Sequence, residues 1–183
     1  MAFIDVPEGV PGIRSLVMFR PETGQHLYSL VQVLLRSDSP LSPAERELIA
    51  THVSSRNNCQ FCRDSHAAAA RELFGENRDI VDCVIHNKPT IEISLKLSAL
   101  LNIAAKVQIN GKEVLPEDIA QARHNGATDR DIHDTVLIAA TFSMLNRYVD
   151  GLAALTPTDP ADYEEMGKRL ASRGYVLPPT KNN

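Results

Sequence analysis

The sequence predicts an all-α fold, a single-domain helical bundle, and three observations support this class. Apolar residues recur at the three- and four-residue spacing of helices in almost every periodic segment, and no segment alternates long enough to predict a strand. The chain is 43% hydrophobic but only 5% aromatic and has no Trp. Leu, Ile, Val and Ala must therefore fill the interior, which suits closely packed helices. A length of 183 residues fits one domain.

The N-terminal part divides into an arm and a first helix. Residues 1–20 are predicted to be an extended arm, because Pro and Gly cluster at positions 7, 9, 11 and 12. A helix is predicted over residues 22–36, directly after Pro21. We assign residues 21–155 to one helical domain and residues 156–183 to a C-terminal helix and tail.

The next two helices have the clearest boundaries. Ser42-Pro43-Ala44-Glu45 is a capping box with Pro at the first helical position, which predicts a helix to Arg56. Asn57-Asn58 interrupts the helical pattern. A second helix is predicted from about Cys59 to Phe74, with Gly75 as its end, so that a Cys-x-x-Cys pair lies at a helix N-terminus.

Five further helices follow from the same apolar spacing and from capping residues. Thr90 is a candidate cap for the second of them, and Thr128 with Asp131 caps the fourth. The predicted ranges are 78–86, 91–109, 116–126, 129–155 and 160–172. Residues 178–183 are predicted to form a frayed tail.

Charge and hydropathy exclude several classes of function. The net charge is −4, and the basic residues are scattered, which argues against a nucleic-acid or anionic-membrane partner. No apolar run is long enough to span a bilayer, and the first residues do not resemble a secretory signal. We therefore expect a cytoplasmic protein, in which a structural disulfide would be rare. We expect no bound cofactor, since no Gly-rich phosphate loop is present.

One cluster of residues suggests thiol chemistry. Cys59, Cys62 and His66 lie on one face of their predicted helix. The N-terminus of that helix favours a thiolate at Cys59, and His66 can take or return the proton of Cys62. Glu47 lies on the preceding helix. An antiparallel hairpin would carry Glu47 away from Cys59, whereas a wide crossing angle would bring them together, and sequence spacing leaves both arrangements open.

The same residues resemble a known family. Glu, eleven intervening residues and Cys-x-x-Cys-x-x-x-His form the signature of the alkylhydroperoxidase D-like proteins in the carboxymuconolactone decarboxylase superfamily, and Glu47, Cys59, Cys62 and His66 match it. Segments 100–104 and 146–151 are similar to later helices of its peroxidase-related branch. The resemblance covers roughly residues 20–155, and the whole spacing is far more specific than Cys-x-x-Cys alone.

The resemblance implies a fold, a reaction and partners. The fold would be a helical bundle that assembles as dimers, trimers or hexamers. Cys62 would attack a peroxide and become a sulfenic acid, Cys59 would close the disulfide, and Glu47 with His66 would relay protons. A dithiol would reduce the disulfide, of the lipoyl type in the best-understood members. One position departs from those members: Phe61 stands where they carry a further histidine.

Other interpretations of the cluster stay open at this point. The two cysteines could be small buried hydrophobes, as is expected for Cys83. Cys59, Cys62 and His66 could bind a metal, with Glu47 or His52 as the fourth ligand. The protein could also be a thiol-disulfide oxidoreductase, or a helical assembly module without catalytic activity.

Overall fold

The computed structural model describes residues 2–86, 88 and 93–176, and its regular secondary structure over these ranges is entirely helical. The predicted all-α class is confirmed, and the Cys-x-x-Cys pair lies at the start of a helix. The α-helices are α1 (Gly12–Phe19), α2 (Pro21–Arg36), α3 (Pro43–Arg56), α4 (Gln60–Phe74), α5 (Asp79–His86), α6 (Leu95–Ile109), α7 (Pro116–His124), α8 (Asp129–Gly151) and α9 (Pro160–Arg173). Short 3-10 turns occupy Gly75–Asn77 and Gly111–Glu113.

Three predictions differ from the observed structure by more than two residues. Residues Gly12–Phe19 form helix α1, where an extended arm was expected, because their apolar residues Leu16 and Val17 are buried against the bundle. Helix α6 begins at Leu95 and is capped by Ser94; Thr90, the predicted cap, lies outside the described residues. Helix α8 ends at Gly151 and not at residue 155, since the chain turns through a positive φ of 48° at Ala153.

The capping box of α3 forms as its sequence predicts. The backbone N–H of Glu45 donates to Ser42 Oγ (3.2 Å), and the N–H of Ser42 donates to Glu45 Oε2 (2.8 Å). These bonds satisfy two N–H groups that would otherwise lack partners in the first turn. The box thereby sets where α3 begins and places Glu47 in its second turn.

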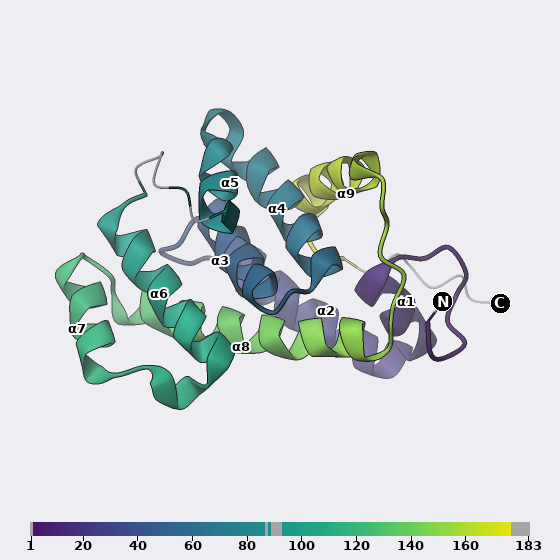
Figure 1. Ribbon diagram of the computed structural model, residues 1–183, viewed down its shortest axis with the longest axis horizontal. Helices are drawn as coiled ribbons and strands as arrows, with labels where there is room; N and C mark the ends of the chain where they lie inside the picture. The colour runs from purple at the N-terminus through teal and green to yellow at the C-terminus, as the bar shows by residue number, and fades with distance from the viewer. Residues whose placement is uncertain (1, 87, 89–92, 177–183) are drawn as a thin grey trace.

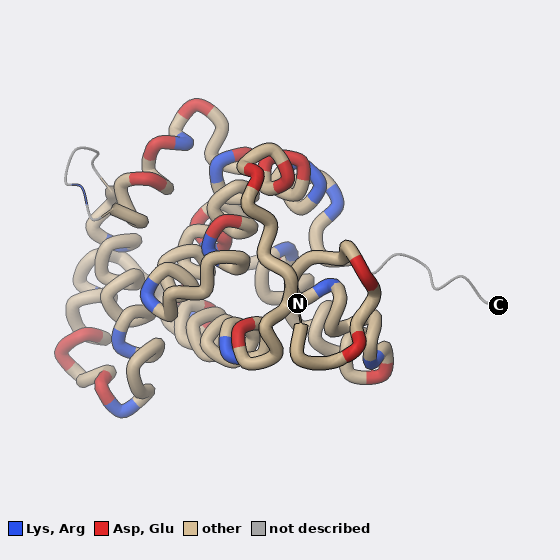
Figure 2. The backbone as a smooth tube through the Cα atoms, turned by 45° about the vertical axis from the view of Figure 1, so that its right-hand side comes forward, with Lys and Arg blue, Asp and Glu red and all other residues tan. Residues whose placement is uncertain are grey.

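Helices α3 and α4 form a hairpin at the centre of the bundle (Figure 1). The long helix α8 packs against α3 and α6, while α9 returns near the end of the chain to cover α4. The core between them is aliphatic, and Leu48, Ile49 and Val53 on α3 are fully buried in it. No helix among the described residues is long and apolar enough to cross a membrane. Figure 2 shows acidic and basic positions interspersed over the helices.

Helix α1 packs against the start of α4 through a glycine. Gly12 has a positive φ of 53°, and a Cβ added to it would lie 2.0 Å from the ring of Phe61. Its N–H donates to the carbonyl of Leu155 (2.8 Å), which ties α1 to the segment after α8. The ring of Phe61 therefore occupies the space that a side chain at position 12 would need.

We expect Gly12→Ala to lower the free energy of unfolding by about 1–3 kcal/mol, because alanine disfavours this φ and its methyl group overlaps Phe61. Urea unfolding of the variant and the parent protein measures the change. Gly9→Ala is the matched control, since Gly9 also has a positive φ (69°) but a Cβ added to it would meet nothing within 4 Å. Equal losses in the two variants would show that contact with Phe61 does not matter.

Candidate redox site

The α3–α4 hairpin brings Glu47 against His66. Glu47 Oε2 lies 2.6 Å from His66 Nδ1, and the Glu47 side chain is fully buried. Because α4 runs back along α3, a residue early in α3 meets one in the second turn of α4, away from Cys59 at the junction. The sequence left two arrangements of these helices open, an antiparallel hairpin and a wide crossing angle. The structure has the hairpin, which pairs the Glu47 carboxylate with His66 and not with Cys59.

Two further groups hold the Glu47 carboxylate. Arg36 Nη2 donates to Glu47 Oε1 (2.5 Å), and the hydroxyl of Tyr175 donates to the same oxygen (2.7 Å). Burial alone would raise the pKa of Glu47, but His66, Arg36 and Tyr175 outweigh it and lower that pKa below its ordinary value. The carboxylate is therefore ionised at neutral pH despite its burial.

The carboxylate also determines the proton positions on His66. An ionised Glu47 only accepts hydrogen bonds, so His66 Nδ1 carries the proton that it donates to Oε2. In neutral His66 the other nitrogen, Nε2, is then unprotonated and can accept a proton. The edge of Phe142 packs against the imidazole, with ring centroids 4.5 Å apart. This is the chemical state of a general base held by a carboxylate.

Sequence reasoning missed Arg36 and Tyr175. Arg36 lies in the last turn of α2, where a basic residue is common for reasons of helix polarity alone. Tyr175 follows α9, in a segment that the sequence placed in a tail. The only local sign in the sequence that Tyr175 has a structural role is its place directly after a glycine. In the structure that glycine, Gly174, has a positive φ of 65°.

The two cysteines lie at the start of α4 and carry free thiols. Cys59 is the N-cap residue and is completely buried, and Cys62 is 5% exposed. The N–H of Cys59 donates to the carbonyl of Ser54 (3.1 Å), across the tight turn made by Asn57 and Asn58. Cys62 is one turn before His66 on the same face of the helix.

Side-chain amides from α6 and α8 support this turn. Asn57 Nδ2 donates to Asn146 Oδ1 (2.9 Å), and Gln108 Nε2 donates to Asn57 Oδ1 (2.8 Å). Asn146 in turn donates to Ser54 Oγ (3.0 Å). The turn that presents Cys59 is thus tied to α6 and α8, and not only to its own helices.

The state of Cys59 differs from the expected one. Its pKa lies well above the ordinary value, because its thiol is hydrogen-bonded to Cys62, because it is buried, and because Asp150 is close. The helix N-terminus does not overcome these effects, so the predicted Cys59 thiolate is not favoured. Cys59 therefore keeps its proton at neutral pH.

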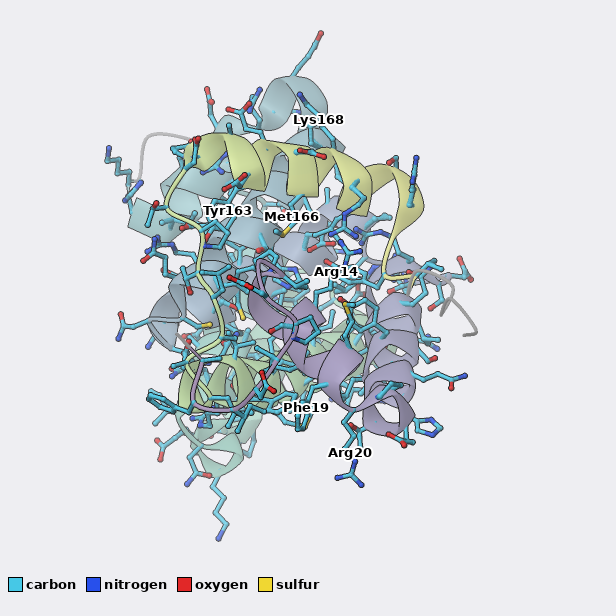
Figure 3. The ribbon with its side chains drawn as sticks, turned by 90° about the vertical axis from the view of Figure 1, so that its right-hand side faces the viewer. Arg14, Phe19, Arg20, Tyr163, Met166 and Lys168 are labelled. Atoms are coloured by element: carbon cyan, nitrogen blue, oxygen red, sulfur yellow. The ribbon has the colours of Figure 1, made fainter. Side chains whose placement is uncertain are left out.

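A cavity of about 190 Å³ opens beside His66. Helices α2 and α8 line it mainly with apolar side chains, whereas α9 contributes charged side chains as well. Phe61, Ser65, His66 and Tyr175 also line it. Cys62 does not line it but lies one turn from His66. In Figure 3, Tyr163 and Met166 lie beneath α9, and Arg14 lies between α9 and α1, where it contributes to the cavity lining together with Met166.

The arrangement of ligands does not resemble a metal centre. Within residues 2–86, 88 and 93–176, no group of three or more His, Cys, Asp or Glu side chains is placed to hold a metal ion. Both oxygens of Glu47 already accept hydrogen bonds, from Arg36, Tyr175 and His66. His52, the other candidate ligand, forms no such group with the cysteines and His66.

Fold and site together define an all-helical protein with a buried Cys-x-x-Cys pair and a carboxylate–histidine pair on the same hairpin. Residues 21–106 match the carboxymuconolactone decarboxylase family. The matched segment is just under half of the chain, and it makes the chain similar to this family. No curated protein matches the chain.

Three solved structures are similar to the chain in fold, and two of them are described as peroxidase-related proteins. An uncharacterized peroxidase-related protein from Silicibacter sp. TM1040 is 26% identical, with a TM-score of 0.78 over 89% of this chain and 94% of that one. An alkylhydroperoxidase AhpD core protein from Ralstonia eutropha JMP134, also described as uncharacterized and peroxidase-related, is 27% identical, with a TM-score of 0.76 over 87% and 82%. A protein of unknown function from Agrobacterium tumefaciens is 17% identical and shares the fold, with a TM-score of 0.68 over 87% and 100%.

Proposed function

We propose that this protein is a thiol-dependent peroxidase that reduces hydroperoxides through Cys62 and Cys59. The Cys62 thiolate attacks the peroxide, the O–O bond breaks, and the leaving alkoxide takes up a proton to become the alcohol. Cys62 is thereby oxidised to a sulfenic acid. The Cys59 thiol then attacks that sulfur and releases water, which leaves a Cys59–Cys62 disulfide. A dithiol reduces the disulfide and is itself oxidised.

The contact between Glu47 and His66 is the observation that supports this proposal best. The 2.6 Å bond leaves Nε2 of His66 as a proton acceptor one turn from Cys62. A base in that place can take the Cys62 proton and return it to the leaving oxygen. Glu47 stabilises the imidazolium that forms in between, because its charge is buried beside the ring.

The two cysteines differ in ways that suit separate roles. Cys59 is fully buried and keeps its proton, while Cys62 is slightly exposed. A buried, protonated thiol next to a sulfenic acid is placed to resolve it and is poorly placed to meet a substrate. Because both sulfurs are recessed, we expect a slender dithiol, such as a lipoyl-type group, to reduce the pair. This burial also favours peroxidase over protein disulfide exchange.

A thiol titration tests the cycle. The chain has three cysteines, and we expect one equivalent of cumene hydroperoxide to remove two thiols and leave the Cys83 thiol. Dihydrolipoamide should restore both, and intact mass should show the loss of two hydrogens and no added oxygen. Cys83 is the internal reference, because it lies on α5, away from the pair.

Three results would count against the proposal. One is the loss of a single thiol, and another is no loss at millimolar peroxide. The third is faster turnover with a small disulfide substrate than with peroxide, which would favour the thiol-disulfide oxidoreductase. Metal in the purified protein together with unreactive thiols would instead favour the non-catalytic module.

A further inference from the structure

Tyr175 enters the site from the far end of the chain and is held there by its backbone and its ring. Its N–H donates to Gln32 Oε1 (2.7 Å), and the guanidinium of Arg36 lies over its ring, 5.2 Å from the centroid. Gly174 permits the sharp turn out of α9 through its positive φ. The segment after α9 therefore presents Tyr175 from a fixed position.

The Tyr175 hydroxyl contacts both members of the carboxylate–histidine pair. It lies 2.7 Å from Glu47 Oε1 and 3.1 Å from His66 Nδ1. The rings of Tyr175 and His66 are nearly parallel, at 20°, with centroids 5.9 Å apart. The hydroxyl thus closes a triangle with the carboxylate and the imidazole, and the Tyr175 ring limits rotation of the His66 ring.

This hydroxyl acts as a donor. Burial raises the pKa of Tyr175 well above its ordinary value, and the charge of Glu47 adds to the effect. Tyr175 therefore keeps its proton and gives it to Glu47 Oε1, while its oxygen faces the Nδ1 proton of His66. A group in this state holds its neighbours in place and does not exchange protons with a substrate.

Among the residues that the structure describes, no other side chain supplies this contact. Arg36 binds the same carboxylate oxygen but makes no bond to His66. Phe61, which precedes Cys62, carries no polar group, and its ring packs against Gly12. Only Tyr175 touches Glu47 and His66 together among the described hydrogen bonds of the pair.

We propose that Tyr175 is a positioning residue that holds the Glu47–His66 pair with its free Nε2 available to Cys62, so that the segment after α9 completes the site. The expected effect of Tyr175 on the rate of peroxide reduction rests on the proposed peroxidase function. Its structural consequence, the restraint of the His66 imidazole, can be measured whether or not the protein consumes peroxide.

Tyr175→Phe removes only the hydroxyl and tests the proposal in the full-length protein. Stopped-flow oxidation of the reduced protein by cumene hydroperoxide, without reductant, gives the rate constant for the attack by Cys62. We expect this rate constant to fall about tenfold, as for the loss of one hydrogen bond to a charged group. Tyr148→Phe is the control, because Tyr148 is a partly buried tyrosine on α8 that packs against the apolar cluster around Cys59 and Cys62 but makes none of the hydrogen bonds of the Glu47–His66 pair.

Nuclear magnetic resonance of His66 supplies a readout that a purely structural role would not change. In the parent protein we expect the tautomer with Nδ1 protonated and slow exchange of that proton with water. In Tyr175→Phe the same proton should exchange faster and its resonance should move, because the hydroxyl no longer covers it. Tyr148→Phe should retain the parent spectrum.

The outcomes separate this inference from the proposed function. If Tyr175→Phe matches Tyr148→Phe in both rate and His66 spectrum, the positioning role is wrong. It is also wrong if the rate and thermal stability fall while the His66 signals stay unchanged, since Tyr175 would then only support the fold. If the parent protein does not react with peroxide but the His66 signals change as expected, the peroxidase proposal fails and the positioning role stands.

Discussion

Cys62→Ser is expected to lower peroxide consumption to the uncatalysed background, the largest effect of any single substitution in this protein. A serine hydroxyl stays protonated near neutral pH and cannot form a sulfenic acid, so the first step of the proposed cycle has no nucleophile. Peroxide loss, followed with dihydrolipoamide as the reductant, measures the effect. A Cys62→Ser variant that retains the parent rate would remove Cys62 from the mechanism.

The partner cysteine should give a different result. Cys59→Ser leaves Cys62 free to react once, so we expect one equivalent of peroxide to be consumed and a sulfenic acid that dimedone traps on Cys62. Cys83→Ser is the control and should keep the parent rate, because this side chain lies on another helix, α5, where it bonds the carbonyl of Lys88. Dimedone labelling on Cys59 in the Cys62→Ser variant would reverse the two assignments.

Glu47→Gln is expected to slow Cys62 oxidation by roughly 10²- to 10⁴-fold, because an amide no longer stabilises the imidazolium and can impose the wrong tautomer on His66. It should also lower stability by about 3 kcal/mol, since Arg36 then lies beside a neutral group with little access to water. Stopped-flow kinetics and urea unfolding at neutral pH measure the two effects. Glu45→Gln is the matched control, because Gln preserves the capping box two residues away.

The stability effect should depend on pH in a defined direction. The pKa of Glu47 is lowered in the folded protein from an ordinary value of 4.5. Its contribution to stability is therefore fully present above pH 4.5 and is lost as the pH falls through the lower, folded-state pKa. We expect the difference in unfolding free energy between the parent protein and Glu47→Gln to shrink over that range. A difference that stays constant on acidification would mean that Glu47 is not ionised in the fold.

Much of the fold could be predicted because its signals are local. The capping box at Ser42, the Pro residues at helix starts and the glycines at helix ends act within a few residues of the boundaries they set. The predictions that differ from the structure concern segments whose conformation depends on tertiary packing. Helix α1 forms in a Pro- and Gly-rich arm because its apolar face is buried, and α8 ends where the chain turns at Ala153.

The site was predicted in part. The spacing of Cys59, Cys62 and His66 needs only one helix, so the sequence placed them on one face. The partner of Glu47 depended on how two helices pack, and the hairpin decided in favour of His66. The state of Cys59 was expected wrongly, because burial and the neighbouring thiol outweigh the helix N-terminus. The assembly state and the physiological reductant stay predictions.

The sequence by itself determined the helical class, most helix boundaries and the one-turn spacing of the thiol and imidazole groups, because these depend on the regular geometry of a single helix. The tertiary structure alone decided that Arg36 and Tyr175 hold Glu47. Tyr175 is 128 residues from Glu47 along the chain, and their contact exists because α9 packs back over α4 and the chain turns at Gly174. Hydrogen bonds over such separations follow from packing, which no local pattern records.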